Sequence, residues 1–390
     1  MLLFPIGTER KLRSRPWLTI GLIAANVFVF FFLQPHPPAS NFSLVWARFA
    51  WWMPATYMFS HGDIFHLLGN MLILWVFGPH AEDALGRGRV LVVYFSAGLG
   101  AAALHVLASV AFYPQEATMG LVGASGAIMG IVALFVLRFH GVRVRFFFWL
   151  LLPAVFHVRA LWVGIAYLVS DLGWALLGVG AGGGGGVAHW AHVGGFLVGG
   201  IWAWRLRLAE EGTHEIRFAQ AQGYVRAGAW DRAARVLEGE IAARPGDPEL
   251  HSAAALCYEH LQGAEHRAAA HWNEHLRLLL VARREDEALA RFRALITRFR
   301  PRQLDPAVLL RLGAAAERQS AHDLAVAAWM GVAQAHPDRP QAPAAALRAA
   351  QALLRMGESA RARTALQVIE STWPDSEEAL SAAQMLREMG

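Results

Sequence analysis

Three short clusters of polar side chains interrupt the apolar first half of the chain, and their residue types suit the hydrolysis of a peptide bond. The first cluster holds His66 and Asn70, which are four residues apart and so share one face of a helix. The second holds Ser125, and the third holds His189 and His192. A serine can attack a carbonyl carbon when a histidine accepts its proton, provided that further hydrogen-bond donors stabilise the oxyanion that forms.

Glycines follow two of these clusters at helical spacing, and small residues four apart let membrane helices approach one another closely. The pairs are Gly126 with Gly130, and Gly195 with Gly199. We therefore expect the helices that carry them to bring Ser125 within reach of His192. The free N–H groups at a helix start near Ser125 would favour a developing negative charge, and the side chains of His66 and Asn70 could donate to the same oxygen.

Other protease chemistries fit the sequence less well. The only lysine is Lys11, in the N-terminal tail, which excludes a serine–lysine pair within the membrane. The His-Glu-x-x-His motif of zinc proteases is absent. Asp63 and Asp171 could form an aspartyl pair or orient His192, but we interpret each as a solvated helix cap. A two-residue serine–histidine arrangement is the simplest left.

The elements that must position these residues are six apolar stretches, each close to the roughly 20 helical residues that cross a bilayer core of about 30 Å. They cover residues 16–33, 64–79, 90–112, 121–137, 160–178 and 188–204. We interpret the segment from Val142 to Phe156, which mixes arginines with aromatic residues, as lying in the membrane interface. The glycine-rich loop at 180–186 is expected to be flexible.

Charge separates the chain into two halves. Up to Leu208 it holds 13 of the 35 Lys and Arg residues and 6 of the 30 Asp and Glu residues, whereas the remainder holds 22 and 24, as in a water-soluble helical domain. In the six-span arrangement only Arg48 falls on the side opposite to the other basic residues of the first half. This bias predicts a multi-pass protein of the plasma (inner) membrane with both termini cytoplasmic, and gives no reason to expect a nucleic-acid partner.

The sequence pattern of the second half predicts alanine-rich helical hairpins. Prolines recur at Pro301, Pro337 and Pro374, with spacings close to the 34-residue tetratricopeptide unit, which this region resembles. Such arrays stack into a shared core and leave a concave binding groove. A helical bundle without a partner remains the alternative. The single cysteine, Cys257, cannot form an internal disulfide, and we interpret it as a buried thiol.

The polar clusters, in their order along the chain, resemble the rhomboid family of intramembrane serine proteases over about residues 15–205. The motifs that carry the resemblance are His61, His66 and Asn70, then Gly123-Ala124-Ser125-Gly126, then Ala191-His192-Val193-Gly194-Gly195 with Gly199. The resemblance implies that Ser125 is the nucleophile and His192 the base. It also implies that His66, Asn70 and the Ser125 backbone N–H are the oxyanion donors, and that the mechanism is metal-free.

The same resemblance decides between the two histidines of the third cluster. The family pattern Ala-His-x-x-Gly fits His192, which has glycines three and seven residues later, whereas His189 has His192 and Phe196 there. We therefore expect His189 to face the interface or a loop. His61 is expected to support the site without being catalytic, as are Gly123, Gly126, Gly195 and Gly199.

Together these features predict an all-α protein: a cytoplasmic tail (1–15), a rhomboid-like six-helix transmembrane bundle (16–208) and a soluble, cytoplasmic α-helical repeat domain (209–390). The expected activity is that of a serine endopeptidase that hydrolyses peptide bonds in or near the transmembrane segments of other membrane proteins. Its expected partners are those substrates, the lipid bilayer and a protein bound by the repeats. The rival hypothesis is an inactive rhomboid-like adaptor, but this chain retains both Ser125 and His192 and has no proline beside the serine.

Overall fold

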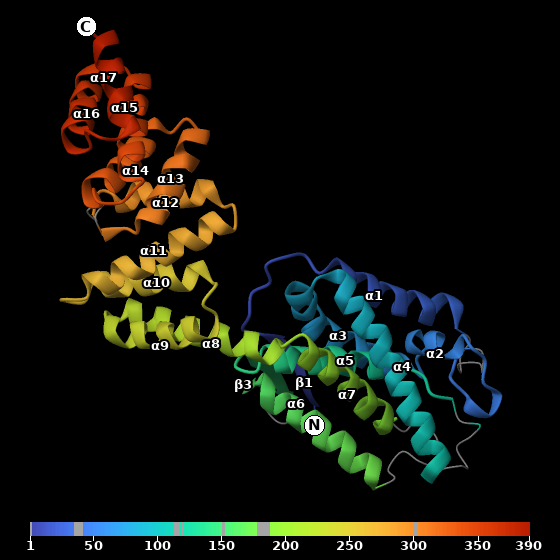
Figure 1. The fold of residues 1–390 in the computed structure, drawn as a ribbon. Coiled ribbons are helices and arrows are strands. Elements are labelled where there is room, and N and C mark those ends of the chain that lie inside the picture. The colour runs from blue at the N-terminus through green and yellow to red at the C-terminus, as the bar shows by residue number, and fades with distance from the viewer. Residues whose placement is uncertain are drawn as a thin grey trace. The chain divides into compact units, whose positions relative to one another are not determined.

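The computed structural model describes residues 2–34, 42–112, 118, 120–149, 153–177, 188–298 and 303–390. The loop at 180–186, which the sequence predicts to be flexible, lies outside these residues. The chain divides into two compact units, Met1–Ile216 and Arg217–Gly390. Both units are mainly helical, which confirms the predicted fold class (Figure 1).

In the part of the first unit that the structure describes there are six principal helices, a few short helical turns and a small sheet. Its elements are β1 (Leu2–Thr8), α1 (Trp17–Phe28), the π-helical turn η1 (Val29–Leu33), the 3-10 turn η2 (Trp46–Arg48), α2 (Met53–Thr56), the 3-10 turn η3 (Tyr57–Phe59), α3 (Ile64–Leu85), α4 (Arg87–Phe112), α5 (Ser125–Arg138), β2 (Arg143–Trp149), β3 (Pro153–Arg159), α6 (Ala160–Leu176), α7 (His189–Arg205) and the start of α8 (Leu208–Arg226).

Each of the six apolar stretches coincides with one of these helices. By length and composition, α3 and α4 are sufficient to cross a bilayer, a property that the buried helices of soluble proteins can share. The helix α1 with its π-helical turn, α5 and α6 are apolar but shorter. The number of spans therefore stays a prediction, although the helices themselves are present where the sequence places them.

Helix α5 forms the centre of the first unit. All of its residues from Gly126 to Val136 are buried, as expected of a helix that is apolar on every side. It packs against α7, α4 and α3 (Figure 1). Ser125, the first residue of α5, therefore lies at one end of the core, and Arg138 lies at the other, about 20 Å away along the helix axis.

Glycines bring α5 and α7 into backbone contact. A methyl group added at Gly130 would lie 3.2 Å from the Gly195 carbonyl oxygen, and one added at Gly195 would collide with the Gly126 carbonyl oxygen. One added at Gly199 would collide with the Gly130 carbonyl oxygen. Because any side chain would force these backbones apart, the small residues set the distance between the helices that carry Ser125 and His192.

A three-stranded antiparallel sheet is the element that the sequence does not predict. Strand β2 pairs with β1 on one side and β3 on the other, so that Phe4 faces Phe147 and Arg143 faces Arg159. The segment interpreted as interfacial is thus a β-hairpin, and the N-terminal tail adds a third strand to it. The unit is accordingly not wholly α-helical, although helices dominate it.

The second unit is a succession of antiparallel helices that stack in chain order (Figure 1). The continuation of α8 leads into α9 (Trp230–Ala243), α10 (Pro248–Glu259), α11 (Glu265–Val281), α12 (Glu285–Leu295), α13 (Pro306–Arg318), α14 (His322–Ala335), α15 (Ala342–Arg355), α16 (Ser359–Thr372) and α17 (Glu377–Glu388). Pro337 and Pro374 lie in turns between helices, Pro301 is outside the described residues, and Cys257 is fully buried.

Candidate active site

Ser125 opens helix α5, where the backbone N–H groups of the first turn have no partner within the helix. The turn before it depends on Gly123, whose φ of +117° is strained for any residue with a side chain. The Gly123 N–H donates to the carbonyl of Tyr57 at 3.0 Å, which anchors this turn to the 3-10 turn before α3. The serine is half-buried at the position where the chain enters the core.

His66 and Asn70 lie against the same turn. A methyl group added at Gly123 would lie 2.8 Å from Nε2 of His66 and 3.6 Å from Nδ2 of Asn70. Both side chains come from the first two turns of α3, which begins after Asp63. The Asp63 carboxylate accepts a hydrogen bond from the His66 backbone N–H at 2.9 Å, so Asp63 is a helix cap, as predicted.

The hydrogen bonds of His66 and Asn70 leave one donor on each side chain available near Ser125. The Gly62 N–H donates to Nδ1 of His66 in a long bond of 3.4 Å, and a neutral imidazole that accepts at Nδ1 carries its proton on Nε2. Nδ2 of Asn70 is buried and has no hydrogen-bond partner in the described part of the chain. Buried donors without partners are uncommon, and a catalytic role is one of the reasons for them.

His192, in the first turn of α7, is held by an acidic residue of α6. Its Nδ1 lies 3.0 Å from Oδ1 of Asp171, and Nδ1 of His189 lies 2.7 Å from the same oxygen. A carboxylate accepts hydrogen bonds but cannot donate them, so Nδ1 of His192 carries the proton and a neutral ring has its lone pair on Nε2. That Nε2 atom is buried and has no hydrogen-bond partner among the described residues.

One expectation about these residues is wrong. Asp171 is not a solvated cap: it is 8% exposed and hydrogen-bonded to two histidines across the contact between α6 and α7. His189 shares the Asp171 carboxylate with His192, and its side chain is 14% exposed. The sequence did contain the signal, since Asp171 is the only acidic residue of an apolar helix and a buried charge requires a partner.

His61 packs against His66. Its ring meets the His66 ring edge-on, with centroids 5.2 Å apart, and its side chain is buried. The Gln34 side chain holds the His61 backbone at both polar groups: Oε1 accepts from the His61 N–H at 2.8 Å, and Nε2 donates to the His61 carbonyl at 2.7 Å. His61 thus supports the position of the His66 ring.

The opposite end of the first unit carries a charged cluster. Glu215 of α8 accepts hydrogen bonds from Arg10 at 2.7 Å and from Arg138 at 2.9 Å. Partial burial alone would raise the pKa of the Glu215 carboxyl, but the bonds and charge of Arg10, followed by those of Arg138, lower it below its ordinary value. The charged end and the polar cluster around Ser125 thus lie at opposite ends of α5.

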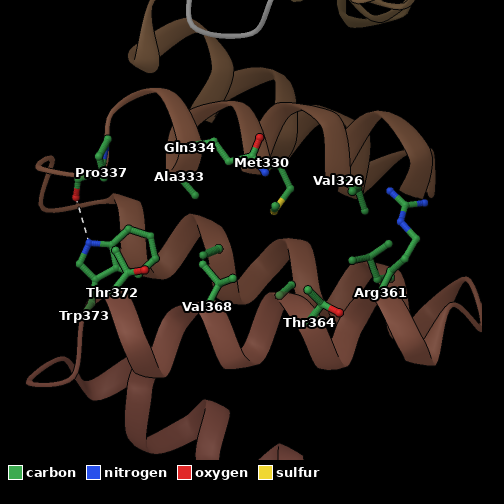
Figure 2. A pocket seen from close by; sticks show the side chains of 13 residues that line it. Val326, Met330, Ala333, Gln334, Pro337, Arg361, Thr364, Val368, Thr372 and Trp373 are labelled. Carbon is green, nitrogen blue, oxygen red and sulfur yellow. Dashed lines mark hydrogen bonds between the residues drawn. The ribbon is translucent and has the colours of Figure 1, made fainter.

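The second unit contains a groove of about 590 Å³ between α14 and α16 (Figure 2). Apolar side chains such as Val326, Met330 and Val368 line it, and Arg361 stands at its edge. The Trp373 indole N–H donates to the carbonyl of Pro337 at 2.9 Å and joins the two sides of the groove at one end.

Comparisons with known proteins agree with these two units. Residues 48–209 match the rhomboid domain, and residues 344–376 match a tetratricopeptide repeat. The chain thus contains a rhomboid domain, which makes it a membrane protein, together with a repeat of the type that mediates protein interactions.

Three relatives illustrate the similarity, which is confined to part of each protein. The rhomboid protease GluP of Bacillus subtilis is 33% identical over 128 residues, covering 30% of this chain and 24% of that protein. The mitochondrial rhomboid protein 1 of Saccharomyces cerevisiae is 30% identical over 168 residues, covering 42% and 44%. The rhomboid protease AarA of Providencia stuartii is 33% identical over 137 residues, covering 30% and 48%. The chain therefore spans less than half the length of these relatives.

Proposed function

We propose that the chain is an intramembrane serine endopeptidase that hydrolyses peptide bonds in or near the transmembrane segments of other membrane proteins. In this proposal residues 16–208 form the protease domain and residues 209–390 a cytoplasmic repeat domain. Ser125 is the nucleophile, His192 is the base, and Asp171 orients His192. The site needs no metal and no cofactor.

The observation that carries the proposal is the state of the His192 ring. Asp171 binds its Nδ1, while Nε2 is buried and has no partner in the described part of the chain. A general base that accepts the serine proton only when a substrate is bound is expected to have such a free nitrogen. The backbone contact between α5 and α7 supports the pairing, because a methyl group added at Gly126, next to Ser125, would lie 3.4 Å from the carbonyl of Ala191, next to His192.

The chemistry begins when Nε2 of His192 accepts the Ser125 hydroxyl proton as Oγ attacks the carbonyl carbon of the substrate. The oxyanion receives hydrogen bonds from Nε2–H of His66, from Nδ2 of Asn70 and from the Ser125 backbone N–H. The His192 imidazolium, stabilised by Asp171, then gives its proton to the leaving amine. A water molecule hydrolyses the acyl-serine by the same route in reverse.

The distribution of charge supports an active site at the outer face of the plasma (inner) membrane. Ser125 and His192 begin their helices, whereas Arg138 and Arg205 lie in the last turns of the same helices. Because arginines concentrate on the cytoplasmic side, this polarity favours cytoplasmic termini and a repeat domain that binds a cytoplasmic protein. The groove between α14 and α16 is the surface that we propose for that protein.

The experiment that tests the activity is the cleavage of a panel of transmembrane reporter substrates by purified protein in lipid. We expect the native chain to cleave at least one reporter, and Ser125→Ala and His192→Ala to lose that cleavage while keeping the native melting temperature. His189→Gln is the matched control, because it changes the other histidine of the same helical turn and should remain active. A folded native protein that cleaves no reporter and does not react with a serine-directed fluorophosphonate would favour the adaptor hypothesis instead.

A further inference from the structure

Asp171, His189 and His192 form a compact set of metal-ligand atoms. The two histidines are three residues apart in the first turn of α7, so their rings share one face, and Asp171 reaches them from α6. One atom from each residue, two imidazole nitrogens and a carboxylate oxygen, lies within 4.8 Å of the other two. The Asp171 carboxylate is almost fully buried, and each histidine side chain is 14% exposed.

These ligands match zinc in kind and in spacing. Imidazole nitrogen and carboxylate oxygen bind Zn²⁺ at about 2.0–2.2 Å, which in a tetrahedral site separates neighbouring ligand atoms by about 3.3 Å. The observed contacts to Asp171, at 2.7 and 3.0 Å, are a few tenths of an ångström shorter than this separation, and the two histidine nitrogens lie within 4.8 Å of each other. Three protein ligands leave a fourth position for water, as in other zinc sites that exchange with solvent.

We propose that Asp171, His189 and His192 bind a zinc ion that switches the protease off. The inhibitory part of this inference rests on the proposed function, whereas the binding part does not. Zinc bonded to Nδ1 of His192 takes the place of the proton there, and the neutral ring then carries that proton on Nε2. Nε2 becomes a hydrogen-bond donor and cannot accept the Ser125 proton, so no base remains. The ion also joins α6 to α7 through three bonds.

A variant of His189 can separate zinc binding from catalysis. It has no part in the proposed peptide-bond chemistry, yet it supplies one of the three ligands. The variant His189→Gln keeps a side chain that can donate to Asp171 but removes an imidazole ligand. His157→Gln, a histidine of β3, is the matched control for the loss of a histidine elsewhere in the same unit.

Binding is measured first, without any need for catalysis. Chelator-treated Ser125→Ala protein in lipid is titrated with ZnCl2 by calorimetry, alone and combined with His189→Gln, Asp171→Asn or His157→Gln. We expect His189→Gln and Asp171→Asn each to remove one bound zinc ion per chain or to weaken its binding at least tenfold, and His157→Gln to leave it unchanged. Equal zinc binding by all four folded proteins overturns the proposed site.

Cleavage then tests the inhibition. ZnCl2 should abolish reporter cleavage by the native chain at concentrations that fill the site, and a chelator should restore it, whereas His189→Gln should cleave at the same zinc concentrations. A His189→Gln protein as sensitive to zinc as the native chain contradicts the inference. A protein that binds zinc at this site but cleaves no reporter after chelation would instead refute the proposed protease activity.

Discussion

Nδ1 of His192 lies 3.0 Å from Oδ1 of Asp171, across the contact between two helices that the sequence separates by a loop of more than ten residues. This bond restrains the orientation of the imidazole, whose Nε2 atom is buried and has no hydrogen-bond partner among the described residues. In the proposed mechanism, Asp171 therefore acts through His192 as a positioning residue. In the proposed site, the serine–histidine pair inferred from sequence motifs thus gains an acidic third residue.

Asp171→Asn tests that role. An asparagine can turn its amide nitrogen toward Nδ1 and favour the ring tautomer with the proton on Nε2, so we expect kcat for reporter cleavage to fall by about tenfold or more. KM should change little, because Asp171 does not lie among the groups proposed to bind substrate. Unaltered kcat in a folded Asp171→Asn protein would show that His192 needs no such support.

The glycine contact between α5 and α7 gives a prediction of stability. A methyl group at Gly195 collides with the Gly126 carbonyl oxygen, so Gly195→Ala should reduce the free energy of unfolding by about 1–3 kcal/mol and lower the melting temperature. Gly200 is on the same helix with open space where a methyl group would stand. Gly200→Ala should therefore leave stability unchanged or raise it slightly. Equal melting temperatures for the two variants would contradict the close approach of the helices.

The charged cluster at the other end of α5 predicts a pH dependence of stability. Because the pKa of the Glu215 carboxyl is lower in the folded chain, its ion pairs with Arg10 and Arg138 stabilise the fold above the ordinary pKa of a glutamate. That stabilisation is lost as the pH falls through the lowered value. Native protein should therefore melt at a higher temperature than Glu215→Gln at pH 7, and the difference should shrink progressively below about pH 4.

The measurement is thermal unfolding in lipid between pH 7 and pH 3. Glu210→Gln, an exposed glutamate of the same helix, serves as the control and should unfold like the native chain throughout. If the difference in melting temperature between native protein and Glu215→Gln stays constant down to pH 3, the Glu215 carboxylate is not its cause.

Local signals in the sequence are sufficient to predict much of this structure. Long apolar stretches predict each principal helix of the first unit, since burial or lipid requires continuous apolar surface in a helix. The type and spacing of His66, Asn70, Ser125 and His192 predict the polar site. Proline spacing and alternating helical hairpins predict the repeats, because each repeat is a local unit that buries its apolar face on its neighbours.

Contacts between distant segments could not be predicted in the same way. The pairing of Phe4 with Phe147 joins strands more than a hundred residues apart, and a run of aromatic residues fits a membrane interface as well as a strand. The bond between Asp171 and His192 depends on how α6 packs against α7. The sequence places Asp171 near the end of α6 and His192 near the start of α7, on the same predicted side of the membrane, but the packing decides that they meet rather than face solvent.

The most direct test of the central claim is the identity of the residue that reacts with a serine-directed fluorophosphonate, located by peptide mass spectrometry on the purified protein in lipid. We expect a single adduct on Ser125 in native protein and in His189→Gln, and its loss in folded His192→Gln. An adduct on Ser125 that persists in His192→Gln but disappears in His189→Gln would show that His189, and not His192, is the base. No adduct on Ser125 in folded native protein would contradict the protease itself.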